Sequence, residues 1–128
     1  MTRVAVIGCG YFARFHLDAW RRLPVRLVAV CDEDRAKAEA AMSPSSTLAA
    51  AGGAGGNSAQ PFTAPAPTLP RSTGAGAVFT DAAAMLDAVR PDFVDIVTPP
   101  ATHLALVRLC AERGIPAICQ KPLAPDWP

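Results

Sequence analysis

Two glycines and an alanine near the start of the chain have the spacing of a phosphate-binding turn. Gly8, Gly10 and Ala13 form the pattern G-x-G-x-x-A directly after the apolar residues 4–7, and a helical pattern follows at once. In this pattern the first glycine permits a tight turn, the second lets a pyrophosphate approach the backbone, and the third residue lets helix and strand pack closely. The phosphates would bind the free N–H groups at the helix N-terminus, where the macrodipole is positive.

An acidic residue after the next apolar run supports this interpretation. Asp32 follows the run at residues 25–30 and comes after Gly10 at about the distance, ~20 residues, expected of an acid that hydrogen-bonds a ribose 2′-hydroxyl. The alternative is a tight βα turn without a ligand, with Asp32 as a helix N-cap. The order strand, glycine turn, helix, strand and acid favours the nucleotide site.

Length and composition limit the other classes of function. The chain has 128 residues, of which 51% are hydrophobic, and a net charge of +1. It therefore fits one domain with a core, and its unclustered basic residues argue against nucleic acid and anionic membranes as partners. It has no apolar run of the ~20 residues that a membrane span needs. The N-terminus is predicted to be a strand rather than a signal peptide, so we expect a cytoplasmic location.

The cysteines offer a second chemistry. Cys9, Cys31, Cys110 and Cys119 form no C-x-x-C pair, but three of them lie near the ends of predicted strands. Proximity in space would allow a metal or redox site. Reduced thiols are the preferred interpretation for a cytosolic protein.

The remaining patterns alternate between helix and strand. Strands are predicted at residues 77–79, 93–97 and 115–119, and helices at about 12–23, 34–42, 80–89 and 103–113. Asp34 and Thr80 are the expected N-caps, and Gly114 is expected to end the last helix. The alternation predicts a doubly wound parallel sheet with right-handed crossovers.

Hydrophobic periodicity predicts which helix faces are buried. The first helix has a stripe at helical spacing, made of Phe12, Phe15, His16, Ala19, Trp20 and Leu23. The last has Leu104, Val107, Cys110 and Ala111. His16 is interpreted as a packed or capping histidine. Asp95, in the middle of a strand, is expected to make a structural hydrogen bond.

Residues 43–76 differ in composition from the rest of the chain. They consist mainly of Ala, Gly, Ser, Pro and Thr, with Arg71 as the one charged residue and no apolar periodicity. Such a segment buries too little surface to offset its chain entropy. We interpret it as a disordered insertion within a single domain of residues 1–128. A functional lid is the alternative.

Four stretches together resemble the glucose–fructose oxidoreductase / inositol dehydrogenase (Gfo/Idh/MocA) family. They are Gly8-Cys9-Gly10-Tyr11-Phe12-Ala13-Arg14-Phe15-His16, Val30-Cys31-Asp32, residues 92–103 with Thr98-Pro99-Pro100 and His103, and Ile118-Cys119-Gln120-Lys121-Pro122-Leu123. The resemblance implies the Rossmann domain of an NAD(P)-dependent oxidoreductase acting on sugars, polyols or their derivatives. The last two stretches are more specific than the glycine pattern.

The resemblance also implies roles for individual residues. The turn Gly8, Cys9, Gly10, Tyr11, Phe12 and Ala13 would hold the pyrophosphate, and Asp32 would bind the adenosine ribose and favour NAD over NADP. Thr98, Pro99 and Pro100 would line the cofactor cleft, with His103 beside it. Lys121 matches the lysine of the family's Glu-Lys-Pro motif near nicotinamide and substrate, which makes it the candidate catalytic residue. Gln120, which stands where the family often has Glu, is placed with Lys121 among the cofactor-binding residues.

Taken alone, Thr98-Pro99-Pro100 also fits a rigid turn, and Lys121 a solvated loop lysine. The family's second domain and the usual last strand of the sheet are not expected in this chain. Two functions therefore stay open: the cofactor-binding part of an oxidoreductase, truncated or split, and a dinucleotide-binding module or sensor without turnover. A third interpretation is a degenerate fragment that no longer folds well. The candidate partners are the dinucleotide, a separate C-terminal domain and a second copy of the chain.

Overall fold

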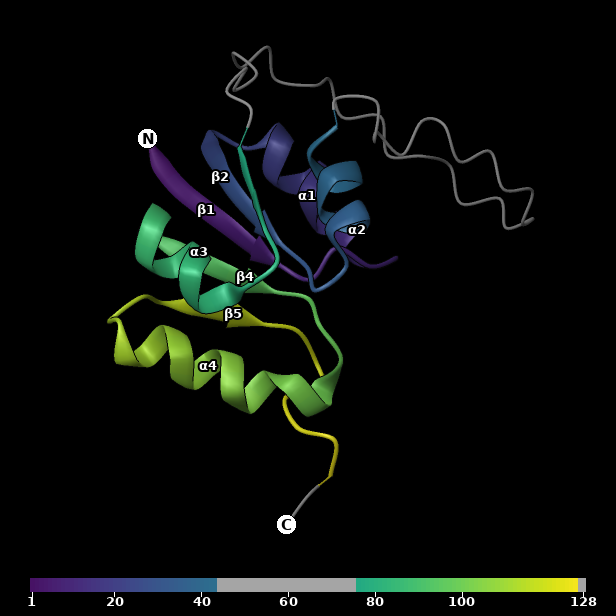
Figure 1. Cartoon of the computed structure of the whole chain (residues 1–128), viewed down its shortest axis with the longest axis vertical. Helices are drawn as coiled ribbons and strands as arrows, with labels where there is room; N and C mark the ends of the chain where they lie inside the picture. Colours follow the sequence, from purple (N-terminus) through teal and green to yellow (C-terminus); the bar gives the residue numbers. More distant parts are fainter. Residues whose placement is uncertain (44–75, 127–128) are drawn as a thin grey trace, which may run out of the picture.

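The computed structural model describes residues 1–43 and 76–126, which form one parallel sheet with helices on both faces (Figure 1). The strands, in the order β3-β2-β1-β4-β5, are β1 (Thr2–Ile7), β2 (Val25–Cys31), β3 (Ala77–Phe79), β4 (Phe93–Ile96) and β5 (Ala117–Cys119). The helices are α1 (Ala13–Arg22), α2 (Arg35–Met42), α3 (Ala82–Val89) and α4 (His103–Glu112), with a short 3₁₀ turn, η2 (Pro100–Thr102), before α4. The predicted parallel α/β fold is confirmed. Most of the segment predicted to be a disordered insertion, residues 44–75, lies outside the described residues.

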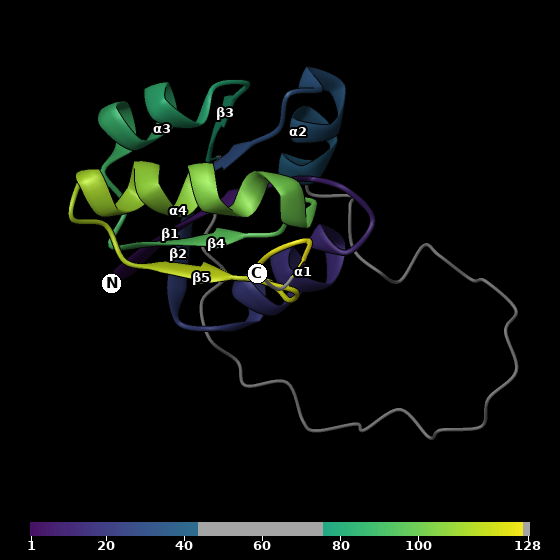
Figure 2. The ribbon, with the colours of Figure 1, turned by 90° about the horizontal axis from the view of Figure 1, so that it is seen from below.

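Alternation along the central strand divides the core into two layers. Val4 and Val6 of β1 pack with α1 and α2, whereas Ala5 and Ile7 pack with α3 and α4. Successive side chains of a strand point to opposite faces, so a strand covered on both faces must be apolar at every position. Figure 2 shows α3 and α4 on one side of the sheet and α1 on the other.

The helix ends agree with most of the expected caps. Asp34 caps α2 by accepting from the backbone N–H groups of Ala36 and Lys37. The expectation that Thr80 caps α3 is wrong, because the cap is Asp81, whose carboxylate accepts from Ala84 N at 2.7 Å. Asp81 is the residue whose extended backbone precedes the first helical turn, which is where a side-chain oxygen can reach those N–H groups.

The predicted inward stripe of α1 is wrong in part. Ala13 and Leu17 are the buried residues of this helix, whereas Phe12 is 67% exposed and Phe15 is 42% exposed. The glycine turn explains the difference, because Ala13 packs against the sheet directly after it. Phe12 and Phe15 lie on other sides of the helix from Ala13 and therefore face outward. Periodicity alone does not distinguish an aromatic stripe that faces the core from one that faces solvent.

The stripe predicted for α4 is also wrong in part. Cys110 is buried as expected, but Leu104 is 61% exposed and Val107 is 37% exposed. His103 begins the buried face instead, and Gly114, with φ +65°, follows the helix where a left-handed residue was expected. No helix in residues 1–43 and 76–126 is long and apolar enough to cross a membrane.

Leu17→Ala should destabilise the fold by about 2–5 kcal/mol, because it leaves a cavity between α1 and the sheet. The matched control, Leu104→Ala, changes the same side chain at an exposed helical site and should alter the free energy of unfolding by no more than about 0.5 kcal/mol. Urea denaturation followed by circular dichroism measures both. An equal decrease in the free energy of unfolding for both variants would contradict the assignment of buried faces.

Candidate functional site

The register of the sheet aligns the ends of all its strands. Ile7 pairs with Cys31 on one side and with Ile96 on the other. Cys31 pairs in turn with Phe79 of β3, and Ile96 pairs with Cys119 of β5. The residues that follow these ends therefore share the carboxyl edge of the sheet. In an open parallel sheet, ligands bind at this edge where the strand order reverses, which here is between β1 and β4.

Gly8 is required by the fold itself. Its φ is +98°, and a Cβ at this position would overlap the Val97 carbonyl oxygen and come within 2.9 Å of Thr98 Cγ2. Its N–H donates to the Cys31 carbonyl at 2.8 Å. Gly8 thus closes the turn where β1, β2 and β4 end together.

Gly10 has no comparable role among the described residues. A Cβ built on it would meet no atom within 4 Å, and its φ is not positive. Neither packing nor backbone conformation explains a glycine there. Open space above Gly10 matches the requirement that the second glycine of the pattern leave room for a pyrophosphate.

Asp32 connects the glycine turn to the start of α2. Its Oδ2 accepts from Cys9 N and its Oδ1 accepts from Asp34 N, each at 2.8 Å. The alternative that Asp32 is the N-cap of α2 is therefore wrong, since Asp34 has that role. A carboxylate has about four lone-pair positions, so Asp32 retains the capacity to accept from a ribose hydroxyl.

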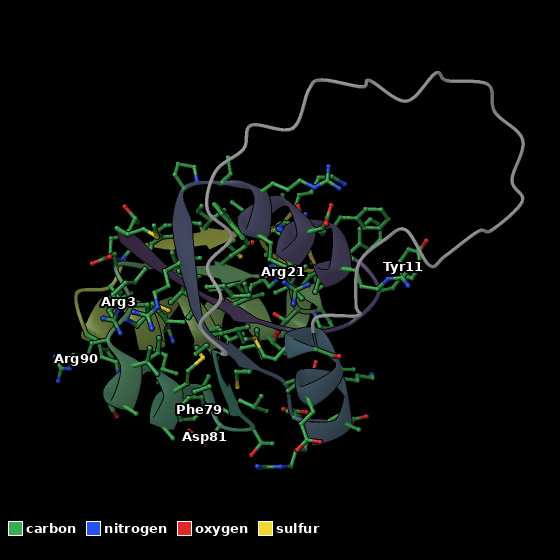
Figure 3. The ribbon with its side chains drawn as sticks, turned by 90° about the horizontal axis from the view of Figure 1, so that it is seen from above. Arg3, Tyr11, Arg21, Phe79, Asp81 and Arg90 are labelled. Atoms are coloured by element: carbon green, nitrogen blue, oxygen red, sulfur yellow. The ribbon has the colours of Figure 1, made fainter. Side chains whose placement is uncertain are left out.

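Aromatic side chains surround the start of α1. Tyr11 is 66% exposed, its ring meets those of Phe12 and Phe15 edge-on, and the Arg14 guanidinium lies 4.5 Å from its centroid. No side chain caps the N-terminus of α1, so its first N–H groups are available to an anion. In Figure 3, Tyr11 lies at the end of the sheet opposite Arg3 and Arg90.

His103 ties together the loops that follow β4 and β5. The ring is 1% exposed, with Nε2 2.8 Å from the Thr98 carbonyl oxygen and Nδ1 2.9 Å from that of Pro122. Both ring nitrogens are thus directed at backbone oxygens. The run Thr98-Pro99-Pro100 leads into η2, where the Thr102 hydroxyl is 2.7 Å from both Thr98 Oγ1 and the Pro99 carbonyl oxygen.

The loop after β5 carries Gln120 and Lys121. Gln120 Oε1 accepts from Lys121 N at 2.8 Å, and Gln120 Nε2 lies 3.1 Å from His16 Nε2. His16 Nδ1 lies in turn 2.7 Å from Asp95 Oδ2. The expected structural hydrogen bond of Asp95 is confirmed, and His16 is packed between two polar partners.

The four cysteines form no disulfide in the described part of the chain. All are free thiols, and Cys9 Sγ lies 3.6 Å from the Cys31 carbonyl oxygen. Burial, reinforced by the Asp32 carboxylate, raises the pKa of the Cys9 thiol to about 12. Burial also raises the pKa of Cys31 to about 11, so both stay protonated near neutral pH. Within residues 1–43 and 76–126, no three His, Cys, Asp or Glu side chains are placed to hold a metal ion.

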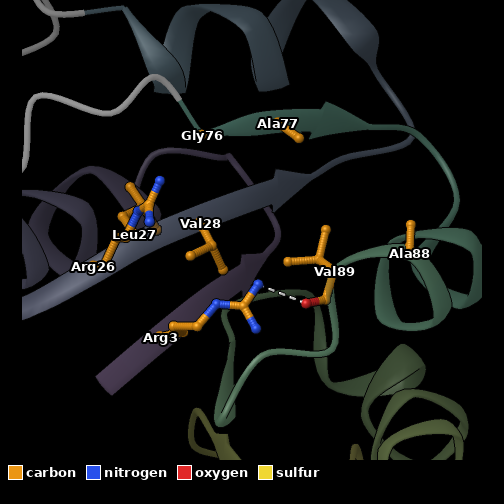
Figure 4. Close-up of a pocket in the computed structure, with 8 residues that line it drawn as sticks. All are labelled: Arg3, Arg26, Leu27, Val28, Gly76, Ala77, Ala88 and Val89. Carbon is orange, nitrogen blue, oxygen red and sulfur yellow. Dashed lines mark hydrogen bonds between the residues drawn. The ribbon is translucent and has the colours of Figure 1, made fainter. Parts of the chain in front are cut away.

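A hollow of about 310 Å³ lies at the opposite, amino-terminal end of the sheet (Figure 4). Its lining includes Arg3, Arg26 and Val28. The Arg3 guanidinium donates to the carbonyls of Val89 at 2.7 Å and Arg90 at 2.9 Å, and so caps the end of α3. This hollow contains none of the residues that follow the strand ends.

The fold and its carboxyl edge define a dinucleotide-binding Rossmann domain. Residues 2–128 match the family model GFO_IDH_MocA, described as "Oxidoreductase family, NAD-binding Rossmann fold", and the chain belongs to this family.

Two curated relatives have the name D-apiose dehydrogenase. The one from Paraburkholderia graminis is 41% identical over 121 residues, which are 94% of this chain and 25% of that protein. The one from Rhizobium rhizogenes is 34% identical, again over 94% of this chain and 27% of its own length. The chain thus spans about a quarter of the length of these relatives.

Solved structures agree with the fold. An oxidoreductase from Agrobacterium radiobacter in complex with NAD⁺, L-tartaric acid and magnesium superposes with a TM-score of 0.70 at 28% identity, over 98% of this chain and 29% of that one. A myo-inositol dehydrogenase from Lactobacillus casei in complex with NAD(H) and myo-inositol has a TM-score of 0.70 at 24% identity, over 97% and 29% of the two chains. The second likeness supports the fold alone.

Gly8→Ala should lower the free energy of unfolding by at least about 2 kcal/mol, because the new Cβ adds backbone strain and overlaps Val97. Gly10→Ala is the matched control and should change it by no more than about 0.5 kcal/mol. Chemical denaturation of the two variants provides the comparison. Similar destabilisation by both would show that the turn differs from the one described.

Proposed function

We propose that this chain is the cofactor-binding part of an NAD-dependent oxidoreductase that acts on a sugar, a polyol or a derivative of one. The observation that carries the proposal is the open space above Gly10, at the strand-order reversal and in front of the uncapped N-terminus of α1. Membership of an NAD-binding family and the names of the relatives support the cofactor and the substrate class.

The residues of the glycine turn fit a pyrophosphate. Gly10 leaves space for the pyrophosphate to approach the backbone. The first N–H groups of α1 would donate hydrogen bonds to it, and the positive end of the helix dipole favours an anion there. We assign Gly8, Cys9, Gly10, Tyr11, Phe12 and Ala13 to this part of the site. Asp32 would accept from the adenosine ribose and oppose a 2′-phosphate through its charge, which favours NAD over NADP.

The loops after β4 and β5 would form the nicotinamide side of the site. Bound NAD⁺ supplies a hydride acceptor. Thr98, Pro99 and Pro100 would form a stiff wall, which His103 holds to the neighbouring loop through the Thr98 and Pro122 carbonyls. Lys121 is exposed at the same edge and is the candidate to donate or accept a proton at a substrate hydroxyl.

A dinucleotide-binding module without turnover is the alternative function. Of the histidines and lysines at the described carboxyl edge, His103 and His16 have both ring nitrogens engaged, whereas the Lys121 side chain is exposed. Placing a substrate carbon against the nicotinamide requires more groups than this edge presents. Saturable reduction of NAD⁺ by the chain with a sugar or polyol would exclude this alternative.

Gly10→Ala should weaken NAD⁺ binding by at least about tenfold while leaving the fold intact, because its Cβ occupies the approach of the pyrophosphate. Isothermal titration calorimetry of the wild type and the variant measures the affinities. Gly114→Ala, outside the site, is the control and should bind NAD⁺ as the wild type does once it is folded. Unchanged affinity in Gly10→Ala, or no binding by the wild type, would refute the proposed site.

The wild type should bind NAD⁺ more tightly than NADP⁺ by about tenfold or more, because the Asp32 carboxylate repels a 2′-phosphate. Asp32→Asn keeps an acceptor oxygen but removes the charge and should reduce this preference. Asp81→Asn removes a charge at the cap of α3 and should leave the preference as it is. If Asp32→Asn retains the full preference, a different residue selects the cofactor.

A further inference from the structure

A chain of polar contacts connects the centre of the sheet to the loop that carries Lys121. Asp95, in β4, is 1% exposed, and its Oδ2 lies 2.7 Å from His16 Nδ1 of α1. His16 Nε2 lies 3.1 Å from Gln120 Nε2, just beyond β5. Gln120 Oε1 accepts from Lys121 N at 2.8 Å. Elements more than a hundred residues apart in sequence are thus joined by consecutive contacts.

The chemistry of the four groups determines which atom donates at each contact. A carboxylate only accepts, so His16 must donate to Asp95 from Nδ1. When the ring carries one proton, on Nδ1, Nε2 has a lone pair that can accept from the Gln120 amide N–H₂. The amide oxygen remains to accept from Lys121 N. Every contact therefore pairs a donor with an acceptor.

The position of Asp95 depends on this arrangement. Both of its hydrogen bonds fall on Oδ2, from His16 and from Trp20 Nε1 at 2.7 Å, and Oδ1 is buried without a partner among the described residues. A buried carboxyl group is costly unless its partners hold it. The sheet therefore retains a polar group at its centre whose contacts lead outward to the candidate site.

We propose that Asp95 and His16 are positioning residues that act through Gln120 to fix the backbone of Lys121 at the carboxyl edge. The proposal rests on the proposed function of Lys121 beside the nicotinamide. It also explains what glutamine does at position 120. An amide can donate to a neutral imidazole and accept from a backbone N–H at once, whereas a carboxylate can only accept.

Trp20 provides an internal control for this route. It donates to the same oxygen of Asp95 as His16 does, but among the described residues it makes no hydrogen bond with Gln120. His16→Phe and Trp20→Phe each remove one donor and keep a ring. Both variants weaken the packing around Asp95, and only His16→Phe breaks the route to Lys121.

The test is NMR of the full chain labelled with ¹⁵N. The wild-type His16 ring should carry its proton on Nδ1. The Lys121 amide hydrogen should exchange with solvent about tenfold faster in His16→Phe than in the wild type. In Trp20→Phe its exchange rate should stay within about twofold of the wild-type rate. Equal acceleration in both, no acceleration in His16→Phe, or a proton on Nε2 of His16 would overturn the proposal.

Gln120→Met is a second variant that leaves the buried residues in place. It should accelerate exchange of the Lys121 amide to the same degree as His16→Phe does, and move the His16 Nε2 resonance, because the amide donor is gone. Gln120→Glu replaces the amide donor by a carboxylate that can only accept, so it should also move the His16 Nε2 resonance. An unmoved His16 resonance in both variants would contradict the contact with Gln120.

Calorimetry separates this proposal from the proposed function. His16→Phe should weaken NAD⁺ binding when Lys121 is present. It should not weaken binding further in the Lys121→Ala variant, because His16 is proposed to act through Lys121. Equal weakening in both backgrounds would overturn the positioning role. Absence of NAD⁺ binding by the wild type would refute the proposed function, whereas the NMR result decides the positioning role in either case.

Discussion

The close approach of Gly8 to the carbonyl oxygen of Val97 is the constraint on which the site depends. It can form only without a Cβ, and it brings the ends of β1 and β4 together at the point where the strand order reverses. Five residues further on, the buried Ala13 begins α1, whose N-terminus no side chain caps. The donors proposed to bind a pyrophosphate are thus positioned by one backbone contact.

The two halves of the carboxyl edge are held by different chemistry. Around the glycine turn, the contacts are made by backbone groups and by one carboxylate, Asp32, which accepts from the turn and from the start of α2. On the other half, two histidines make the connections: the buried His103 bridges two carbonyls, and the partly exposed His16 links Asp95 to Gln120. These contacts hold the loops that follow β4 and β5 in place beyond the carboxyl edge of the sheet.

Local patterns in the sequence were sufficient for the strands, the parallel topology and the glycine turn, because these depend on spacing within short segments. The helix faces were harder to predict. Phe12 and Phe15 satisfy a helical stripe but are exposed, since the turn before α1 sets its rotation. The contact of His16 with Gln120 spans 104 positions and depends on where α1 and β5 come to lie in the fold, which no local pattern encodes. The one signal was Asp95, a carboxylate in the middle of an apolar strand that required a donor.

The central claim, that the carboxyl edge of this sheet binds NAD⁺, is tested most directly by titrating the ¹⁵N-labelled chain with NAD⁺ and following its amide resonances. The account predicts shifts at Gly10, Asp32, Thr98 and Lys121, with the amide of Arg26, in the hollow at the opposite end of the sheet, unaffected. Shifts confined to that hollow, or no shifts at saturating NAD⁺, would contradict it.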